Sequence, residues 1–446
     1  MKRFLERISS QSLIRNTAKL SASNILMYVL PIVVTPILSR LYSPYSFGEW
    51  GVFSSVVSIV TIVMFLSLEN TIVKAEETEL GNILALCCVV GMTVVGVFFA
   101  SVCLLAPLMQ GGSFLFDIRW VLLFYLIAYS FYIVAYNIGN RYGRYSSLAT
   151  SNVIQGATQG TMRILFGVMP LVAVNGLVLG TTFAQTATAA FLVFAVWSMC
   201  RSNAWAKISV EGMRGALSKY RKFPLYDAPS NLLAFSTLNL PTIILAGTYS
   251  KASIGCFSIV LQLLLMPMSL VGSAMGKVYY QELCQAGSDS EKAQSVSASI
   301  ISVLLFVSVL PLLAICCGGD RLVVMFLGKD WTDAGVVALL LALWSFPVIL
   351  TQPVLPLFRV CNKQDVLLIY DLAYFAGGIG CIFACCRLGL PMHTALLSYS
   401  VVCAAVKFAL FHKIARLTHF SMRDHKLAIA VWTLALCLFF IRLLFI

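Results

Sequence analysis

The stretch LPIVVTPILSRLYSPYSFGEWGVFSSVV, residues 30–57, is matched far along the chain by LPTIILAGTYSKASIGCFSIVLQ, residues 240–262. Each reads as a Leu-Pro pair, the end of an apolar run, a short loop with Tyr-Ser, a glycine (Gly48 or Gly255) and a new apolar run. Six predicted helices separate the two segments, an even number, so both would enter a bilayer with the same orientation. We therefore expect two parallel, pseudo-symmetric six-helix lobes, with a chance match between two short segments as the alternative.

The composition indicates an all-α polytopic membrane protein. Of the 446 residues, 60% are hydrophobic and 11% are charged, and the mean hydropathy is +0.90. A water-soluble domain could not cover its surface with so few charges. Apolar runs of roughly 20 residues, enough to cross a bilayer, recur along the chain. The predicted spans are 20–40, 46–68, 80–107, 115–138, 148–173, 176–200, 227–249, 252–278, 294–317, 334–358, 366–386 and 390–412.

These spans predict an N-terminal lobe at 1–200 and a C-terminal lobe at 227–416, joined by a basic cytoplasmic linker at 201–226. The remaining segment, 417–446, contains one more apolar run, Leu427–Phe445. This run predicts either a thirteenth membrane helix or a helix that lies along the interface, because Arg442 near its end would otherwise face the outside.

The formal net charge of +13 would suggest a nucleic-acid partner in a soluble protein, but the positions of the basic residues favour a membrane. Basic residues near alternate span ends are the positive-inside pattern, which predicts a cytoplasmic N-terminus, anionic membrane lipid as the partner and no nucleic acid. They gather in five groups: Lys2, Arg3, Arg7, Arg15 and Lys19; Arg141 and Arg144; Arg201, Lys207, Arg214, Lys219, Arg221 and Lys222; Arg359 and Lys363; Lys413, Arg416, Arg423 and Lys426.

The sequence carries no motif for a metal, a cofactor or a nucleotide. Most of the fourteen cysteines lie in apolar runs without C-x-x-C or Cys–His spacing, which indicates small apolar residues. The four histidines show no metal spacing, and no G-x-x-x-x-G-K-[ST] occurs. The loops are short, so they leave little room for an extramembrane catalytic domain, and we expect no enzyme activity.

One predicted span is unusually polar. In NVIQGATQGTMRILF, residues 152–166, the side chains of Asn152, Gln155, Gln159 and Arg163 fall on one helix face, together with Gly156 and Gly160. An arginine at the centre of a membrane helix costs about 2.5–3.5 kcal/mol on insertion scales, so it needs a partner or water. The stripe predicts either the lining of a hydrated, electropositive cavity or a tight helix contact through the glycines.

Other polar residues near span ends would line the same cavity. The first span begins near Lys19 and Asn24, the seventh contains Asn231, and the eighth contains Gln262. The favoured interpretation of Lys19 is a residue at the span end whose ammonium reaches the membrane interface. Few acids are available within the spans: Glu69 and Asp227 are the candidates for coupling to an ion, and Asp371 is expected to pair with Lys407 on the next helix.

Three segments resemble the polysaccharide-biosynthesis, or O-antigen flippase, family of the MOP transporter superfamily. They are KYRKFPLYDAPSNLLAFSTLNLPTIILAGTYSKASIGCFSIVLQLLLMPMSLVGSAMGKVYY (219–280), LPIVVTPILSRLYSPYSFGEWGVFSS (30–55) and SLENTIVKAEE (67–77). The resemblance implies two six-helix lobes around a central cavity. It departs from the family at Asn152 and Gln262, where such flippases often carry arginine, and Arg163 is the candidate replacement.

The resemblance also implies a function. Such a protein would move an undecaprenyl-diphosphate-linked oligosaccharide from the cytoplasmic to the periplasmic leaflet of the bacterial inner membrane by alternating access. A polysaccharide polymerase and a chain-length regulator are the protein partners it implies. A multidrug exporter of the same superfamily, a membrane-embedded glycan-processing enzyme and a scaffold for glycan assembly are the alternatives. An exporter of cations favours an acidic cavity, whereas Arg163 is basic.

Overall fold

The computed structural model describes residues 30–31, 33–105, 113–169, 174–200, 208–286, 291–361, 363–421 and 425–444. Within these ranges every regular element is a helix, as predicted, and nine helices are long and apolar enough to cross a membrane. The helices α6 (Tyr145–Val168), α9 (Ala228–Ala246) and α10 (Lys251–Ala286) occupy three more of the predicted spans. The predicted span 20–40 lies mostly outside the described residues, and 33–41 is helical.

The chain divides into two compact units, and these correspond to the two predicted lobes. Unit 1 comprises residues 1–42 and 52–239, and unit 2 comprises residues 43–51 and 240–446. The division therefore lies inside α9 instead of at the predicted linker 201–226. Residues 43–51, which begin α2, belong to unit 2 although they precede most of unit 1.

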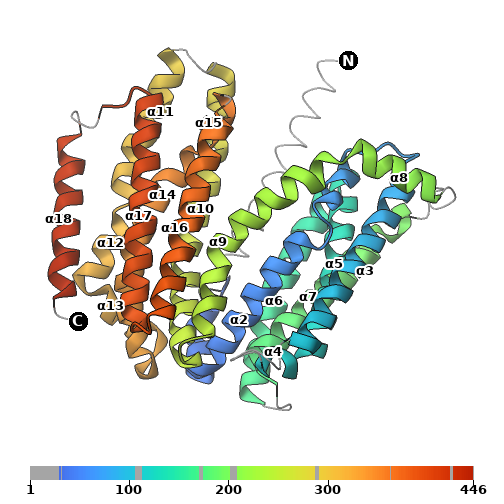
Figure 1. Ribbon diagram of the computed structural model, residues 1–446, viewed down its shortest axis with the longest axis horizontal. Helices are drawn as coiled ribbons and strands as arrows, with labels where there is room; N and C mark the ends of the chain where they lie inside the picture. The colour runs from blue at the N-terminus through green and yellow to red at the C-terminus, as the bar shows by residue number, and fades with distance from the viewer. Residues whose placement is uncertain are drawn as a thin grey trace. The chain divides into compact units, whose positions relative to one another are not determined.

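Unit 1 is built around three helices, α5, α6 and α7, which pack on one another and belong to the blue-to-green half of the chain in Figure 1. The helix α3 covers α5, and the short helix α8 lies against α3. The elements of unit 1 besides α6 are the end of α2 (Pro44–Val63), η1 (Leu68–Val73), α3 (Leu80–Leu105), α4 (Ser113–Asp117), α5 (Arg119–Arg141), α7 (Gly176–Cys200), α8 (Val210–Lys219), the π-helical turn η4 (Phe223–Asp227) and the start of α9.

Unit 2 is organised around α14, which packs against α10, α13 and α17. Almost every side chain of α14 is buried, because this helix is apolar on all faces and is surrounded by others. Besides α10 the elements are α11 (Glu291–Val307), α12 (Leu310–Ala314), η5 (Ile315–Gly319), α13 (Asp320–Leu327), η6 (Lys329–Trp331), α14 (Thr332–Thr351), η7 (Gln352–Val354), α15 (Pro356–Val360), α16 (Gln364–Arg387), α17 (Met392–Leu417) and α18 (Lys426–Leu443).

The two repeated segments cap their helices in the same way. The Ser43 hydroxyl accepts a hydrogen bond from the Ser46 backbone N–H at 3.4 Å, and the Ser250 hydroxyl accepts one from Ser253 at 3.2 Å. Such side-chain bonds satisfy a free N–H group in the first helical turn. These serines follow the tyrosines of the repeat, so the likeness between the segments extends to their local structure.

The glycines of the repeat pack against each other within unit 2. A Cβ atom added to Gly48 would overlap the Lys251 carbonyl oxygen, and one added to Gly255 would overlap the Pro44 carbonyl oxygen. The backbones of α2 and α10 therefore approach as closely as small residues allow. Beside this crossing the Lys251 ammonium donates to Glu49 Oε1 at 2.9 Å. This contact explains why residues 43–51 belong to unit 2.

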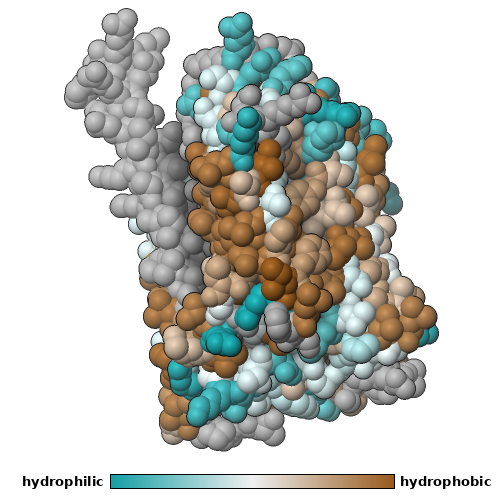
Figure 2. Space-filling model, turned by 90° about the vertical axis from the view of Figure 1, so that its left-hand side faces the viewer, coloured by the Kyte–Doolittle hydropathy of each residue, from teal (hydrophilic) through white to brown (hydrophobic). Residues whose placement is uncertain are grey.

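The last helix, α18, has the features expected of a thirteenth membrane helix. It is long and apolar enough to span, it packs against α12, and Trp432 at its centre donates its indole N–H to the Leu305 carbonyl at 2.8 Å. Figure 2 shows the face of unit 2 that carries α18, with a brown hydrophobic band across the middle and teal residues at both ends. A helix that spans the membrane explains this hydrophobic band, because lipid covers the outer side of such a helix.

The glycine crossing predicts a strong size limit at Gly255. Replacing Gly255 by alanine should lower the stability by about 1–3 kcal/mol, because the new methyl group forces α10 away from α2. Thermal unfolding of the detergent-purified protein measures this. The matched control is Gly380→Ala in α16, where an added Cβ meets no atom within 4 Å. It should leave the stability unchanged or raise it by up to about 1 kcal/mol. Equal effects of the two substitutions would show that the crossing is not tight.

Candidate functional site

The helix α6 turns its polar face inward and its apolar face outward. Asn152 and Arg163 are 4% and 5% exposed, whereas Val153 and Leu165 on the opposite face are 39% and 43% exposed. A soluble helix shows the reverse pattern. The predicted division of α6 into two faces is therefore confirmed. The outer face suits hydrocarbon, and the inner face packs against α7.

Arg163 lies in the seam between α6 and α7. Its Nε and Nη2 atoms both donate to the Thr181 hydroxyl, at 3.3 and 2.8 Å. The Thr181 hydroxyl in turn donates to the Leu177 carbonyl at 2.6 Å. A Cβ atom added to Gly180 would lie 2.8 Å from the Arg163 backbone nitrogen, so this glycine permits the close approach of the two helices. In this conformation the guanidinium is covered by protein.

The rest of the stripe contributes to the same seam. Gln155 donates to Gln185 Oε1 at 3.1 Å, and Gln185 is 1% exposed, with an Nε2 group that has no partner among the described residues. Gln159 is half-buried. Gly160 packs against Val34, whose Cγ2 atom would lie 3.3 Å from an added Cβ. The glycine therefore serves helix packing, while the amides face one another.

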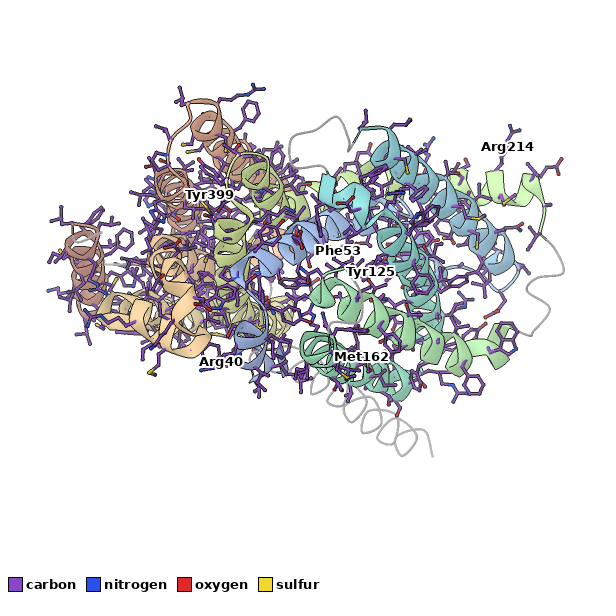
Figure 3. The ribbon with its side chains drawn as sticks, turned by 90° about the horizontal axis from the view of Figure 1, so that it is seen from below. Arg40, Phe53, Tyr125, Met162, Arg214 and Tyr399 are labelled. Carbon is purple, nitrogen blue, oxygen red and sulfur yellow. The ribbon has the colours of Figure 1, made fainter. Side chains whose placement is uncertain are left out.

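A ladder of tyrosines on α5 completes this polar interior, and sequence reasoning missed it. Tyr125, Tyr129, Tyr132 and Tyr136 follow one another with ring centroids 5.8–6.4 Å apart. Tyr125 also packs edge-on against Phe53 at 5.5 Å, and both are labelled in Figure 3. The spacing of four, three and four residues places all four rings on one face. That spacing in YLIAYSFYIVAY, residues 125–136, is the signal that would have found them.

The end of unit 1 that carries Arg141 and Lys219 is here called the basic end. There Arg141 binds the turn between α2 and α3. Its Nη1 atom donates to the Ile72 and Ala75 carbonyls at 2.7 and 2.6 Å, and its Nη2 atom donates to Glu77 at 3.0 Å. A guanidinium suits this role because its donors form a rigid fork.

The same turn presents Glu69. Its Oε1 atom accepts a weak bond from the Asn70 amide at 3.4 Å, and its Oε2 atom is buried without a partner among the described residues. Burial raises the pKa of the Glu69 carboxyl above its ordinary value of 4.5. The groups near it include Tyr129 and Cys87. A buried, poorly paired carboxyl holds its proton to a higher pH than an exposed one does.

The remaining predicted site residues lie in several places. Asn231 on α9 is exposed and donates to the Ser67 hydroxyl at 3.4 Å, next to Glu69. Asp227 is exposed at the end of η4, and Gln262 is half-buried on α10 in unit 2. Lys19 and Asn24 lie outside the described residues.

The predicted ion pair in unit 2 is present. The Lys407 ammonium lies 3.7 Å from Asp371 Oδ1 and above the Tyr374 ring, with 4.4 Å to the centroid. Among the described residues no group of three potential metal ligands occurs, and none of the twelve cysteines whose side chains are described forms a disulfide.

Comparison with known proteins places the chain in a family. The sequence profile of the family described as polysaccharide biosynthesis protein matches residues 37–336, so the chain belongs to that family. No curated protein sequence matches the chain significantly.

Solved structures share the fold at low identity. The lipid II flippase MurJ in an inward closed conformation is 12% identical, with a TM-score of 0.73 over 95% of this chain and 92% of that one. An inward-facing multidrug resistance MATE family transporter of the MOP superfamily is 13% identical, with a TM-score of 0.63 over 89% and 95%. A MOP superfamily transporter from Pyrococcus furiosus, described as having a binding pocket of reverse polarity, is 13% identical, with a TM-score of 0.54 over 91% and 94%. The fold is therefore that of the MOP transporters.

The burial of Glu69 predicts a pH-dependent stability. Because the pKa of Glu69 is higher in the folded than in the unfolded protein, the folded state binds more protons, and stability falls as pH rises above about 4.5. The variant Glu69→Gln has no carboxyl at this position, so its stability does not fall in this way as pH rises. Its melting temperature should increasingly exceed that of the wild type between pH 4.5 and 8. Asp117→Asn, at an exposed acid, is the control and should show a constant difference. A constant difference for Glu69→Gln as well would contradict the prediction.

Proposed function

We propose that this member of the polysaccharide biosynthesis protein family is a flippase. It carries undecaprenyl-diphosphate-linked oligosaccharide repeat units, precursors of O-antigen, capsule or exopolysaccharide, from the cytoplasmic to the periplasmic leaflet by alternating access. The observation that supports this most is the polar interior of unit 1, where α5, α6 and α7 bring hydroxyl, amide and guanidinium groups together within membrane-spanning helices. The proposed setting is the bacterial inner membrane with the N-terminus in the cytoplasm.

A polar interior lowers the main free-energy barrier to moving a glycan across the membrane. A glycan that crosses hydrocarbon unaided leaves its hydroxyl groups without hydrogen bonds, and each unpaired group costs several kcal/mol. Buried hydroxyl and amide side chains replace those bonds. Gln155 and Gln159 suit sugar hydroxyls, because an amide both donates and accepts. The flat faces of Tyr129 and Tyr132 suit the apolar faces of sugar rings.

Arg163 is the group that we assign to the diphosphate. Its Nε and Nη2 atoms form the edge of the guanidinium that binds a phosphate through two parallel hydrogen bonds. In this conformation the Thr181 hydroxyl engages that same edge. A phosphate oxygen would take the place of this neutral hydroxyl when α6 and α7 move apart, and the charged bond would be the stronger one.

Coupling to a proton gradient is assigned to Glu69. Its buried Oε2 atom has no partner among the described residues, and Asn231 reaches the same turn through Ser67. Asp227, the other acid considered, is exposed and therefore less suited to a protonation step that changes packing. The protein requires no cofactor in this scheme.

The first test concerns Arg163. Arg163→Ala should abolish display of the surface glycan while the protein still inserts and accumulates. Arg163→Lys should reduce transport roughly 10- to 100-fold, because one ammonium replaces a two-pronged contact that contributes about 1.5–3 kcal/mol. Immunoblots and glycan staining in a deletion strain measure both. Arg387→Ala, at an exposed helix end, is the control. Normal glycan display with Arg163→Ala would remove this residue from the mechanism.

The second test asks whether water reaches the polar face of α6 during transport. A cysteine at Gln159, in a variant whose native cysteines are replaced, should react with a small charged thiol reagent while the transporter is active. A cysteine at Val153, on the opposite face of the same helix, should stay protected by lipid. Protection of both positions in every state would favour a purely structural seam between α6 and α7.

A further inference from the structure

We infer that unit 1 holds one acyl chain of an anionic phospholipid in an apolar groove between α3, α5 and α7, beside the basic end of the unit. The groove has a volume of about 580 Å³ and lies within the predicted membrane-spanning parts of these three helices. It is distinct from the polar seam between α6 and α7. The residues that line it include Met92, Val95, Phe131, Val134 and Trp197.

The lining of the groove specifies a hydrocarbon ligand. Among the described residues that line it, Ser130 alone carries a hydroxyl, and that hydroxyl already donates to the Leu126 carbonyl at 2.9 Å and contacts the Met64 sulfur at 3.1 Å. The indole N–H of Trp197 adds one donor, and water does not fill a cavity that offers so few hydrogen bonds. The exposed side chains of Met92, Phe131 and Trp197 border the groove, so it is open to the surrounding bilayer. A lipid chain is the occupant that this environment supplies.

The length of the groove favours a phospholipid chain over a polyprenyl chain. Its lining extends from Leu84 to Gly96 on α3, about 18 Å, and from Leu123 to Ile138 on α5, about 22 Å, at 1.5 Å per residue. Half of a hydrocarbon core of about 30 Å is about 15 Å, the depth of one leaflet. Because Leu84 lies one turn from the start of α3, the groove begins at the basic end. It therefore fits one chain of the leaflet on that side, which the positive-inside pattern predicts to be cytoplasmic.

Basic residues next to the groove suit an anionic headgroup. The Ser209 N–H that begins α8 donates to Asn82 on α3 at 3.0 Å, and Asn82 is two residues from Leu84. The helix α8 carries Arg214, which points outward in Figure 3, and is followed by the exposed Arg221 and Lys222. An amphipathic helix with basic residues on its exposed face binds the headgroup region of anionic membranes.

Gly96 makes the groove testable. A Cβ atom added to Gly96 meets no atom within 4 Å, so Gly96→Phe places a ring in open space without disturbing the helices. Gly380 on α16 is equally exposed, also meets no atom within 4 Å, and lies in unit 2. Gly380→Phe is therefore a matched control for adding an aromatic ring to a membrane helix.

Native mass spectrometry of the full-length protein in a mild detergent tests the inference. The wild type and Gly380→Phe should retain one phosphatidylglycerol molecule per chain, and the occupancy of Gly96→Phe should be at least 5-fold lower. The adduct mass separates phosphatidylglycerol from phosphatidylethanolamine and from a polyprenyl phosphate. A wild type without a lipid, equal occupancy of wild type and Gly96→Phe, equal losses in both variants, or a polyprenyl adduct would each overturn the inference.

A second measurement tests the headgroup. The delipidated protein is titrated with phosphatidylglycerol and with phosphatidylcholine of the same chain length. The wild type should bind phosphatidylglycerol at least 5-fold more tightly, and the double variant Arg214→Glu, Arg221→Glu should lose this preference. An unchanged preference would refute the role of α8. Because both readouts are lipid retention, they are independent of glycan transport, and the proposed function can fail while the groove stands.

Discussion

The structure of unit 1 depends on the burial of the polar face of α6 against α7. Hydrocarbon offers no hydrogen bonds, so polar side chains on a membrane helix must find partners within the protein. Arg163 and Gln155 do so through Thr181 and Gln185, and Gly180 lets the two backbones approach closely enough for those contacts. The apolar outer face of α6 is a consequence of the same constraint, because lipid surrounds the unit.

Unit 2 relies on a different close approach. Gly48 and Gly255 bring the starts of α2 and α10 together, and the ion pair between Lys251 and Glu49 lies beside this crossing. The two tyrosines of the repeat then anchor the adjoining helices: Tyr42 donates to the Arg163 carbonyl within unit 1, and Tyr249 donates to the Leu390 carbonyl within unit 2, both at 2.7 Å. The tyrosine of each repeated segment thus binds a backbone carbonyl of its own unit, within α6 for Tyr42 and in the loop between α16 and α17 for Tyr249.

Two kinds of site coexist in unit 1. The interior between α5, α6 and α7 is polar and suits a hydrated substrate, while the groove between α3, α5 and α7 is apolar and suits a lipid chain. The helix α5 contributes to both, with its tyrosines on one face and Phe131 and Val134 on another. One helix can separate the two environments because its faces are chemically distinct.

The all-helical membrane fold, the approximate positions of the long apolar helices and the two lobes follow from sequence alone, whereas short helices such as α8 and α13 were not predicted. An apolar run of membrane length predicts a helix, because a helix satisfies its backbone hydrogen bonds within the segment. The spacing of Tyr-Ser and glycine recurs in two segments and predicts a repeat. The polar and apolar faces of α6 could also be predicted from the sequence, because they depend on helical periodicity. The pairing of Asp371 with Lys407 on consecutive antiparallel helices was also predictable.

Tertiary structure decided what each polar face meets. Periodicity placed Arg163 on the inner face, but only packing set its guanidinium against Thr181, eighteen residues along the chain. The tyrosine ladder was visible as spacing, but the contact of Tyr125 with Phe53 on α2 was set by packing. The assignment of 43–51 to unit 2 follows from the approach of two glycine backbones. Contacts between segments distant in sequence depend on shape, which a linear pattern of residue types does not contain.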